Sequence, residues 1–109
     1  MSHEDYAKCI QACYTCAAAC DHCATACLAE PDPKMMADCI RADLDCADIC
    51  RLTAAVMARG SDSVAEFCRL CAEICEKCAA ICERHAHDHC KQCAKACRDC
   101  ANECIRMAA

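Results

Sequence analysis

Cysteine occupies the positions at which a packed helix normally carries large apolar residues. Along the chain, thiols recur at steps that alternate between three and four, with alanine and charged residues between them. This alternation is the core-facing stripe of a helix that packs against other helices, so the sequence predicts a core lined with thiols. The nineteen cysteines are Cys9, Cys13, Cys16, Cys20, Cys23, Cys27, Cys39, Cys46, Cys50, Cys68, Cys71, Cys75, Cys78, Cys82, Cys90, Cys93, Cys97, Cys100 and Cys104.

Few helix-breaking residues interrupt this pattern, and they divide the chain into helix-length segments. The first helix is expected to start at a cap formed by Ser2 and to end before the break at residues 30–33. Asp32 is expected to cap the second helix, with Pro33 at its first position. Gly60 is expected to end that helix in a left-handed conformation.

The remaining signals predict two further helices. A capping box of Ser63 and Glu66 marks the start of the third helix, which is expected to run to about Arg84. Residues 85–89 form a short connection in which Asp88 is the candidate cap of the fourth helix. Short connections make neighbouring helices antiparallel. The predicted fold is therefore all-α: an antiparallel, up-down-up-down four-helix bundle with a cysteine-lined core.

The second helix carries fewer thiols than the others. Its stripe includes only three cysteines, and the other stripe positions hold Met36, Asp43, Thr53 and Met57. Asp43 is an acid on a core-facing stripe. Three roles are open for it: an oxygen ligand, a hydrogen-bond partner, or a residue at the edge of the core after a small rotation of the helix.

The spacing of the thiols points to a soft metal ion. Eight C-x-x-x-C pairs occur in the sequence, and helical residues four apart have Cβ atoms roughly 5–6 Å apart, more than the roughly 3.5–4.5 Å of a disulfide. A linear S–metal–S unit spans roughly 4.5 Å if each bond is about 2.3 Å. Two-coordinate thiolate binding suits Cu(I), and one Cu(I) per thiolate adds no net charge to the core. The sequence therefore predicts many Cu(I) ions per chain.

Other uses of so many cysteines fit the sequence less well. A disulfide scaffold is disfavoured by the odd number of cysteines and the helical spacing. Iron–sulfur clusters use ligands on loops, and thioredoxin-like chemistry uses a single C-x-x-C in an α/β fold. The alternative that stays open is storage of zinc, or of soft metals in general as in metallothioneins, at cross-helix sites of four cysteines.

The two ends of the predicted bundle differ in chemistry. One end collects Met35, Met36, His85, His87 and His89. Imidazole and thioether groups bind soft cations, so this end is the predicted port, with Met36 and the three histidines as candidate ligands. A solvated loop and core-filling methionines are the alternative. The opposite end is expected to hold an apolar plug of Tyr6, Met57, Val64, Phe67 and Met107.

Composition and charge exclude several classes of function. A net charge of −5 disfavours nucleic acid and anionic membranes as partners. No apolar run is long enough to predict a membrane span, and the start of the chain lacks signal-peptide features, which favours a cytoplasmic location. No enzyme is indicated, because no catalytic base, oxyanion device or cofactor motif is recognisable. The length suits one domain over residues 1–109.

Taken together, the cysteine-striped helices, the C-x-x-x-C pairs and the segment His85-Ala86-His87-Asp88-His89-Cys90 resemble the cytosolic bacterial branch of the copper storage proteins. The resemblance covers nearly the whole chain. It implies a homotetramer of bundles, each storing Cu(I) on pairs of core thiolates, with a mouth at the histidine end. The expected function is cytosolic storage and buffering of Cu(I) without catalysis, with a cytosolic copper chaperone as a candidate partner.

Overall fold

Four long helices account for almost all of the structure. The computed structural model describes residues 3–108, and the side chains from residue 4 onward. Within this range the elements are α1 (His3–Leu28), the short 3-10 helix η1 (Pro33–Met36), α2 (Ala37–Ala58), α3 (Val64–Cys82) and α4 (Asp88–Ala108). The described residues contain no strand, so the predicted all-α class is confirmed.

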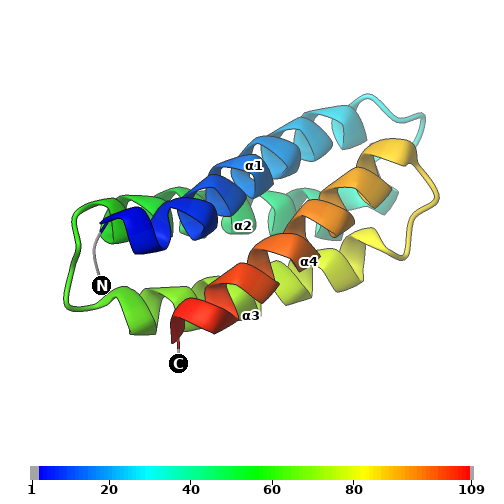
Figure 1. The fold of residues 1–109 in the computed structure, drawn as a ribbon. Coiled ribbons are helices and arrows are strands. Elements are labelled where there is room, and N and C mark those ends of the chain that lie inside the picture. The colour runs from blue at the N-terminus through cyan, green and yellow to red at the C-terminus, as the bar shows by residue number, and fades with distance from the viewer. Residues whose placement is uncertain (1–2, 109) are drawn as a thin grey trace.

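The helices form a closed ring around one long axis (Figure 1). α1 packs against α2 and α4, and α3 packs against the same two helices. Between α1 and α4, the thiol contacts pair Cys9 with Cys104 and Cys23 with Cys90, so the numbering rises on one helix as it falls on the other. α2 and α3 show the same opposed order. The predicted antiparallel up-down-up-down bundle is confirmed, and it measures 47 × 18 × 18 Å.

The break after α1 differs in detail from the prediction. The cap assigned to Ser2 lies outside the described residues. Pro33 begins η1 rather than α2, and the Asp32 side chain makes no capping hydrogen bond. The backbone carbonyl of Asp32 instead accepts the N–H of Met35 at 3.2 Å. This bond closes a tight 3-10 turn, so α2 starts only at Ala37.

The end of α2 is as predicted. Gly60 has a φ of +62°, in the left-handed region that favours glycine. The N–H of Gly60 donates to the Met57 carbonyl at 3.0 Å, and the N–H of Ser61 donates to the Val56 carbonyl at 3.2 Å. These two bonds form a Schellman motif, which satisfies the last carbonyls of the helix and reverses the chain.

The predicted caps of α3 and α4 are wrong. The Ser63 side chain makes no capping bond, because its φ of −97° and ψ of 12° differ from the extended conformation of a side-chain cap. No capping box therefore forms. α3 ends at Cys82, before the predicted Arg84. Asp88 is the first residue of α4, and the carbonyl of His87 accepts the first helical N–H groups instead.

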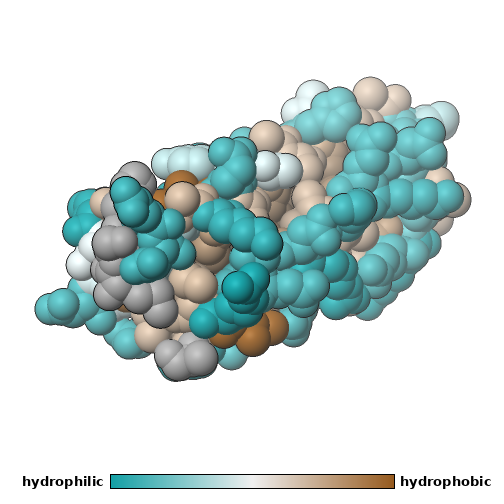
Figure 2. Space-filling view, viewed as in Figure 1, coloured by the Kyte–Doolittle hydropathy of each residue, from teal (hydrophilic) through white to brown (hydrophobic). Residues whose placement is uncertain are grey.

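The core consists mainly of thiols and alanines, and larger apolar side chains gather at one end. All nineteen cysteines are buried. At the end where α2 turns into α3, Tyr6, Met57 and Val64 are buried, and Phe67 and Met107 are partly buried against them. Hydrophilic side chains cover most of the face seen in Figure 2. None of the described helices combines the length and the apolar character that crossing a membrane requires.

Candidate metal centre

The thiols form a continuous column of sulfur atoms along the bundle axis. Steps of three and four keep successive side chains on one face, so each helix directs its cysteines toward the centre. The nineteen thiols are free. Neighbouring Sγ atoms lie 3.3 Å apart at the closest contact, between Cys39 and Cys82, and up to 4.0 Å apart elsewhere. The column is thus dense enough for one metal ion to reach several sulfurs.

The close sulfur contacts run both within and between helices. Along α1, Sγ of Cys16 lies 3.9 Å from Sγ of Cys20, as the C-x-x-x-C spacing predicts. Contacts between helices are at least as short. The Sγ atoms of Cys20 and Cys93 are 3.5 Å apart, and Cys46 lies 3.6 Å from Cys75. The structure therefore offers cross-helix ligand sets in addition to the pairs predicted along one helix.

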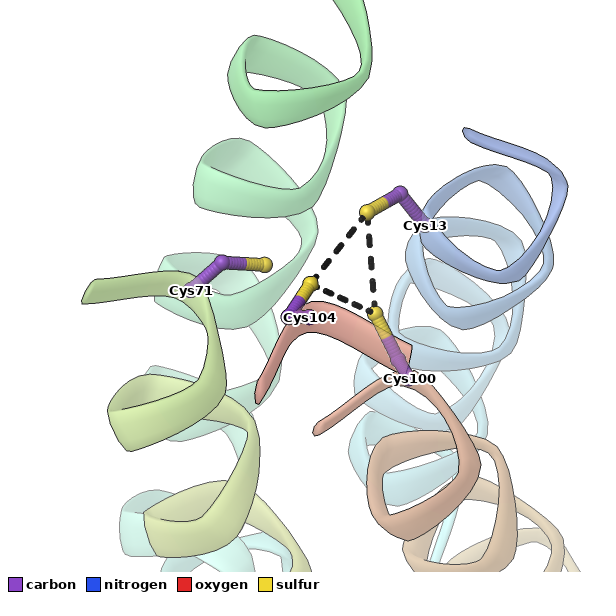
Figure 3. A group of neighbouring side chains, drawn as sticks. All are labelled: Cys13, Cys71, Cys100 and Cys104. Atoms are coloured by element: carbon purple, nitrogen blue, oxygen red, sulfur yellow. Dashed lines mark hydrogen bonds between the residues drawn. The ribbon is translucent and has the colours of Figure 1, made fainter. Parts of the chain in front are cut away.

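Groups of four sulfurs recur along the column. In Figure 3, Cys13 from α1, Cys71 from α3, and Cys100 and Cys104 from α4 point toward one another. Their Sγ atoms all lie within 4.8 Å of each other. The Cys13 sulfur is 3.7 Å from Cys100 and 3.9 Å from Cys104. Such a group can hold one tetrahedral ion or a small cluster of bridged ions.

Several of these groups share cysteines, and this decides how a metal could fill the column. Cys16 and Cys46 belong to two groups, one with Cys50 and Cys75 and one with Cys20 and Cys97. A thiolate in two groups must bridge if both groups are occupied. Four groups have no cysteine in common: Cys13/Cys71/Cys100/Cys104, Cys16/Cys46/Cys50/Cys75, Cys20/Cys78/Cys93/Cys97 and Cys23/Cys27/Cys39/Cys90. They leave Cys9, Cys68 and Cys82 unused.

Asp43 lies fully buried inside the column, not at its edge. Its Oδ1 atom accepts hydrogen bonds from the thiols of Cys93 at 3.2 Å, Cys78 at 3.3 Å and Cys82 at 3.5 Å. Oδ2 accepts a longer contact of 3.8 Å from Cys39. Burial raises the pKa of Asp43 to about 8. In the metal-free protein this residue is a hydrogen-bond acceptor for thiols.

Burial also governs the charge of the thiols near the histidine end. It is the main cause that raises the pKa of Cys90 to about 11, with the neighbouring Cys39 thiolate acting in the same direction. Burial raises the pKa of Cys27 as well. These thiols are therefore protonated at neutral pH, and a metal ion that binds them must displace their protons.

Thr53 takes the place of a thiol near the apolar end. Sγ of Cys46 on α2 lies 3.8 Å from Sγ of Cys16 on α1. One heptad further along α2 is Thr53, and one heptad back along α1 is Cys9, so the antiparallel register puts these two residues at one level. Thr53 is fully buried, and its hydroxyl has no hydrogen-bond partner among the described residues.

His89 joins the opposite end of the column directly to the surface. Its Nδ1 atom lies 3.4 Å from Sγ of Cys23, 3.5 Å from Cys90 and 3.9 Å from Cys27. Its Nε2 atom lies 3.1 Å from Oε1 of Glu30. Sequence analysis singled out His89 but missed Glu30. A signal was present, because Glu30 opens the Pro-containing break that the bundle topology places beside the histidines.

The other candidate residues of this end lie around His89. The His87 ring stacks on the His89 ring, with centroids 5.3 Å apart and planes 3° from parallel. Met36 is buried, whereas Met35 is 73% exposed, so only one of the two methionines belongs to the core. His85 is half-buried and lines a surface pocket with Met36 and His87. The structure therefore brings Met36 and the three histidines to one end of the column.

Comparison with known proteins gives consistent matches over almost the full chain. The family Csp, described as copper storage protein, matches residues 2–109. A curated relative, the cysteine-rich protein YhjQ of Bacillus subtilis, is 50% identical over 87 residues, which cover 79% of this chain and 81% of YhjQ. YhjQ is itself described as uncharacterised.

Two similar solved structures contain copper. The Cu(I)-bound copper storage protein BsCsp3 of Bacillus subtilis has a TM-score of 0.92 and 49% identity, covering 95% of this chain and 98% of its own. A cytosolic copper storage protein of Streptomyces lividans with five coppers has a TM-score of 0.93 and 44% identity, covering 97% and 93%. With its thiol column, its fold and these matches, the chain belongs to the copper storage protein family.

Proposed function

We propose that this chain stores Cu(I) ions on the thiolates of its bundle core. The observation that carries the proposal is the set of nineteen free, buried cysteines that four helices contribute to one core. Soft thiolate ligands favour Cu(I), and similar proteins are described as Cu(I)-bound and as loaded with ten copper equivalents. A core of this kind stores metal rather than performing catalysis on a substrate.

The proposed ligands are the nineteen cysteines, with Asp43, Met36 and the three histidines as additional donors. Each Cu(I) displaces thiol protons as it binds, so loading releases protons to the solvent. Bridging thiolates let overlapping groups fill at the same time, and one Cu(I) per thiolate leaves the column neutral. Asp43 would supply an oxygen donor in the part of the column where α2 has no thiol.

We further propose that Cu(I) passes through the histidine end. The His89 ring contacts both the outermost thiols and the surface carboxylate of Glu30. Imidazole binds Cu(I) less strongly than thiolate does, so an ion can pass inward from nitrogen to sulfur without being trapped. At the other end, Tyr6, Met57 and Val64 fill the core, and no imidazole lies among the buried side chains there.

The cellular location of this chain can be proposed from the same relatives. The Streptomyces lividans protein is described as cytosolic, and we propose a cytosolic location for this chain, with a copper chaperone as exchange partner. We propose that residues 1–109 form a single domain and that bundles assemble as a homotetramer. Leu44 and Leu52 on α2, Leu70 on α3 and Ile105 on α4 are each about half exposed and offer apolar surface for such an assembly.

Storage of zinc is the competing function, because the column also contains groups of four sulfurs, the number of ligands that Zn(II) takes. Titration of the reduced, metal-free protein with Cu(I) under anaerobic conditions tests the proposal. A chromophoric Cu(I) chelator reports free copper. The expected result is saturation at roughly fifteen to twenty ions per chain, about one per cysteine. Saturation at one or two ions would contradict storage and favour a chaperone.

A further inference from the structure

The carboxylate of Glu30 contacts the edge of the His89 ring that points away from the thiols. The side chain lies where α1 has just ended, on a turn in which the N–H of Glu30 donates to the Cys27 carbonyl at 3.3 Å. From there Oε1 reaches 3.1 Å from Nε2 of His89 and 3.6 Å from Nδ1 of His87. Within the described part of the chain, the groups that the Glu30 carboxylate contacts at these distances are these two imidazole rings. The carboxylate thus serves the histidine pair rather than a lysine or arginine.

The contact with Glu30 selects one tautomer of His89. A carboxylate accepts hydrogen bonds, so the nitrogen facing it must carry the proton. This places the proton on Nε2 and leaves the lone pair on Nδ1. Nδ1 is the atom that lies 3.4 Å from Cys23 and 3.5 Å from Cys90. In this tautomer, His89 presents a free donor atom to a metal ion and has no proton to lose at that atom.

The ring of His89 is also restrained on its flat side. The parallel His87 ring stacks against it, and the His89 side chain is only 13% exposed. The carboxylate on one edge, thiols on the other and an aromatic ring on one face leave little room for rotation. Metal-binding histidines in proteins commonly have such a carboxylate on the second nitrogen, where it fixes the tautomer and strengthens the ligand.

We propose that Glu30 is a positioning residue for copper uptake. It fixes His89 with Nδ1 directed at the sulfur group of Cys23, Cys27 and Cys90, so that this group is ready for the first Cu(I) ion to arrive. This inference rests on the proposed function, since it assigns to Glu30 a role in loading the same column. It concerns the rate of loading and not the number of ions stored.

The test compares four variants with the wild-type protein: Glu30→Ala, Glu30→Gln, His89→Ala and the double variant Glu30→Ala/His89→Ala. Glu83→Ala is the matched control. It removes another carboxylate near the same end of the bundle, one that is paired with Arg98 rather than with a histidine. Stopped-flow mixing with a chromophoric Cu(I) complex gives the rate of the first uptake phase. Long-range proton–nitrogen NMR of the metal-free protein gives the tautomer of His89.

Glu30→Ala should slow the first phase by about 10-fold to 100-fold, the range by which losing the carboxylate behind a metal-binding histidine lowers metal affinity or activity. His89 should change from the Nε2–H tautomer to a mixture. Glu30→Gln keeps an oxygen that can accept the Nε2–H bond, so it should retain that tautomer and part of the rate. The control should load at the wild-type rate, and Glu30→Ala, Glu30→Gln and the control should keep the wild-type capacity.

The double variant separates positioning from simple attraction of the cation by the carboxylate. If Glu30 acts through His89, its removal should cause no further slowing once His89 is alanine. Equal slowing in both backgrounds, a wild-type rate for Glu30→Ala, or an unchanged tautomer would each overturn the proposal. Failure of the storage function itself would look different, because the wild-type protein would then bind only one or two ions.

Discussion

A single carboxylic acid inside a thiol column makes the metal-free protein sensitive to pH. Folded Asp43 keeps its proton up to about pH 8, whereas an unfolded aspartate loses it near pH 3.9. Between these values the folded state binds the extra proton. The free energy of unfolding should therefore fall as the pH rises through this window, by at most about 1.4 kcal/mol per pH unit from this residue.

Asp43→Asn should remove that part of the pH dependence, because the amide has no proton to lose in this window. The measurement is the urea midpoint of reduced, metal-free protein at several pH values from 5 to 8. The wild-type midpoint should decline more steeply than that of the variant. Parallel curves would show that Asp43 does not keep its proton in the folded core.

Thr53 gives a second prediction for a single residue. Its buried hydroxyl has no partner within the described structure, and a buried unsatisfied polar group costs about 1–3 kcal/mol. Thr53→Val keeps the shape and removes the hydroxyl, so it should stabilise the metal-free protein by an amount in that range. Urea unfolding of the two proteins measures the difference. Destabilisation by valine would mean that the hydroxyl does have a hydrogen-bond partner in solution.

Individual residues differ in how well the sequence predicts their place. The thiols were predictable because their spacing alone defines a helix face. The sequence left three roles open for Asp43, since a small rotation of α2 decides between the core and its edge. Glu30 was missed altogether. Its contact with His89 joins the connection after α1 to the first turn of α4, and no periodic pattern along the chain encodes that contact.

Among the helices, the end of α2 offers the sharpest test. A Cβ atom at Gly60 would meet nothing within 4 Å, so alanine there introduces no clash. The remaining cost is the left-handed conformation, roughly 1–2 kcal/mol for an L-residue. Gly60→Ala should lower the free energy of unfolding by about that amount in a chemical denaturation series. Asp62→Ala, an exposed change in the same turn, is the control and should have little effect.

An unchanged stability of Gly60→Ala would mean that the Schellman motif is not needed to end α2.

The sequence could predict only part of the structure of the four helices. Their number and approximate limits followed from the thiol stripes and the breakers. The side-chain caps assigned to Asp32, Ser63 and Asp88 were wrong: Asp32 and Ser63 make no side-chain capping bond, and Asp88 lies inside α4, where the carbonyl of His87 accepts the first N–H groups.

For the whole molecule, the first prediction concerns folding without metal. Neutral thiols pack as small apolar groups, and alanines such as Ala47, Ala54 and Ala79 are fully buried in the same core. The reduced apo protein should therefore already be helical. Circular dichroism of anaerobic, chelator-treated protein, before and after addition of Cu(I), checks this. A coil spectrum that becomes helical only with copper would instead indicate folding coupled to metal binding.

The arrangement of sulfurs across helices is a property of the whole bundle. Sequence spacing predicted the pairs along one helix. The groups of four depend on the register between antiparallel helices, which no single stripe specifies. Figure 3 shows the result at one level, where Cys13 of α1 and Cys71 of α3 join the Cys100/Cys104 pair of α4. The structure was therefore needed to show that one thiol can belong to two groups of ligands.

Bridging is the central claim about this column, and metal stoichiometry tests it most directly. Native mass spectrometry would count the ions on the reduced chain after saturation with Cu(I) and, separately, with Zn(II). Zinc needs four ligands per ion, so it should stop at about four, the number of groups that share no cysteine. Cu(I), with bridging thiolates, should reach roughly fifteen to twenty. Saturation by both metals at about four ions would contradict a bridged copper store and favour discrete tetrahedral sites.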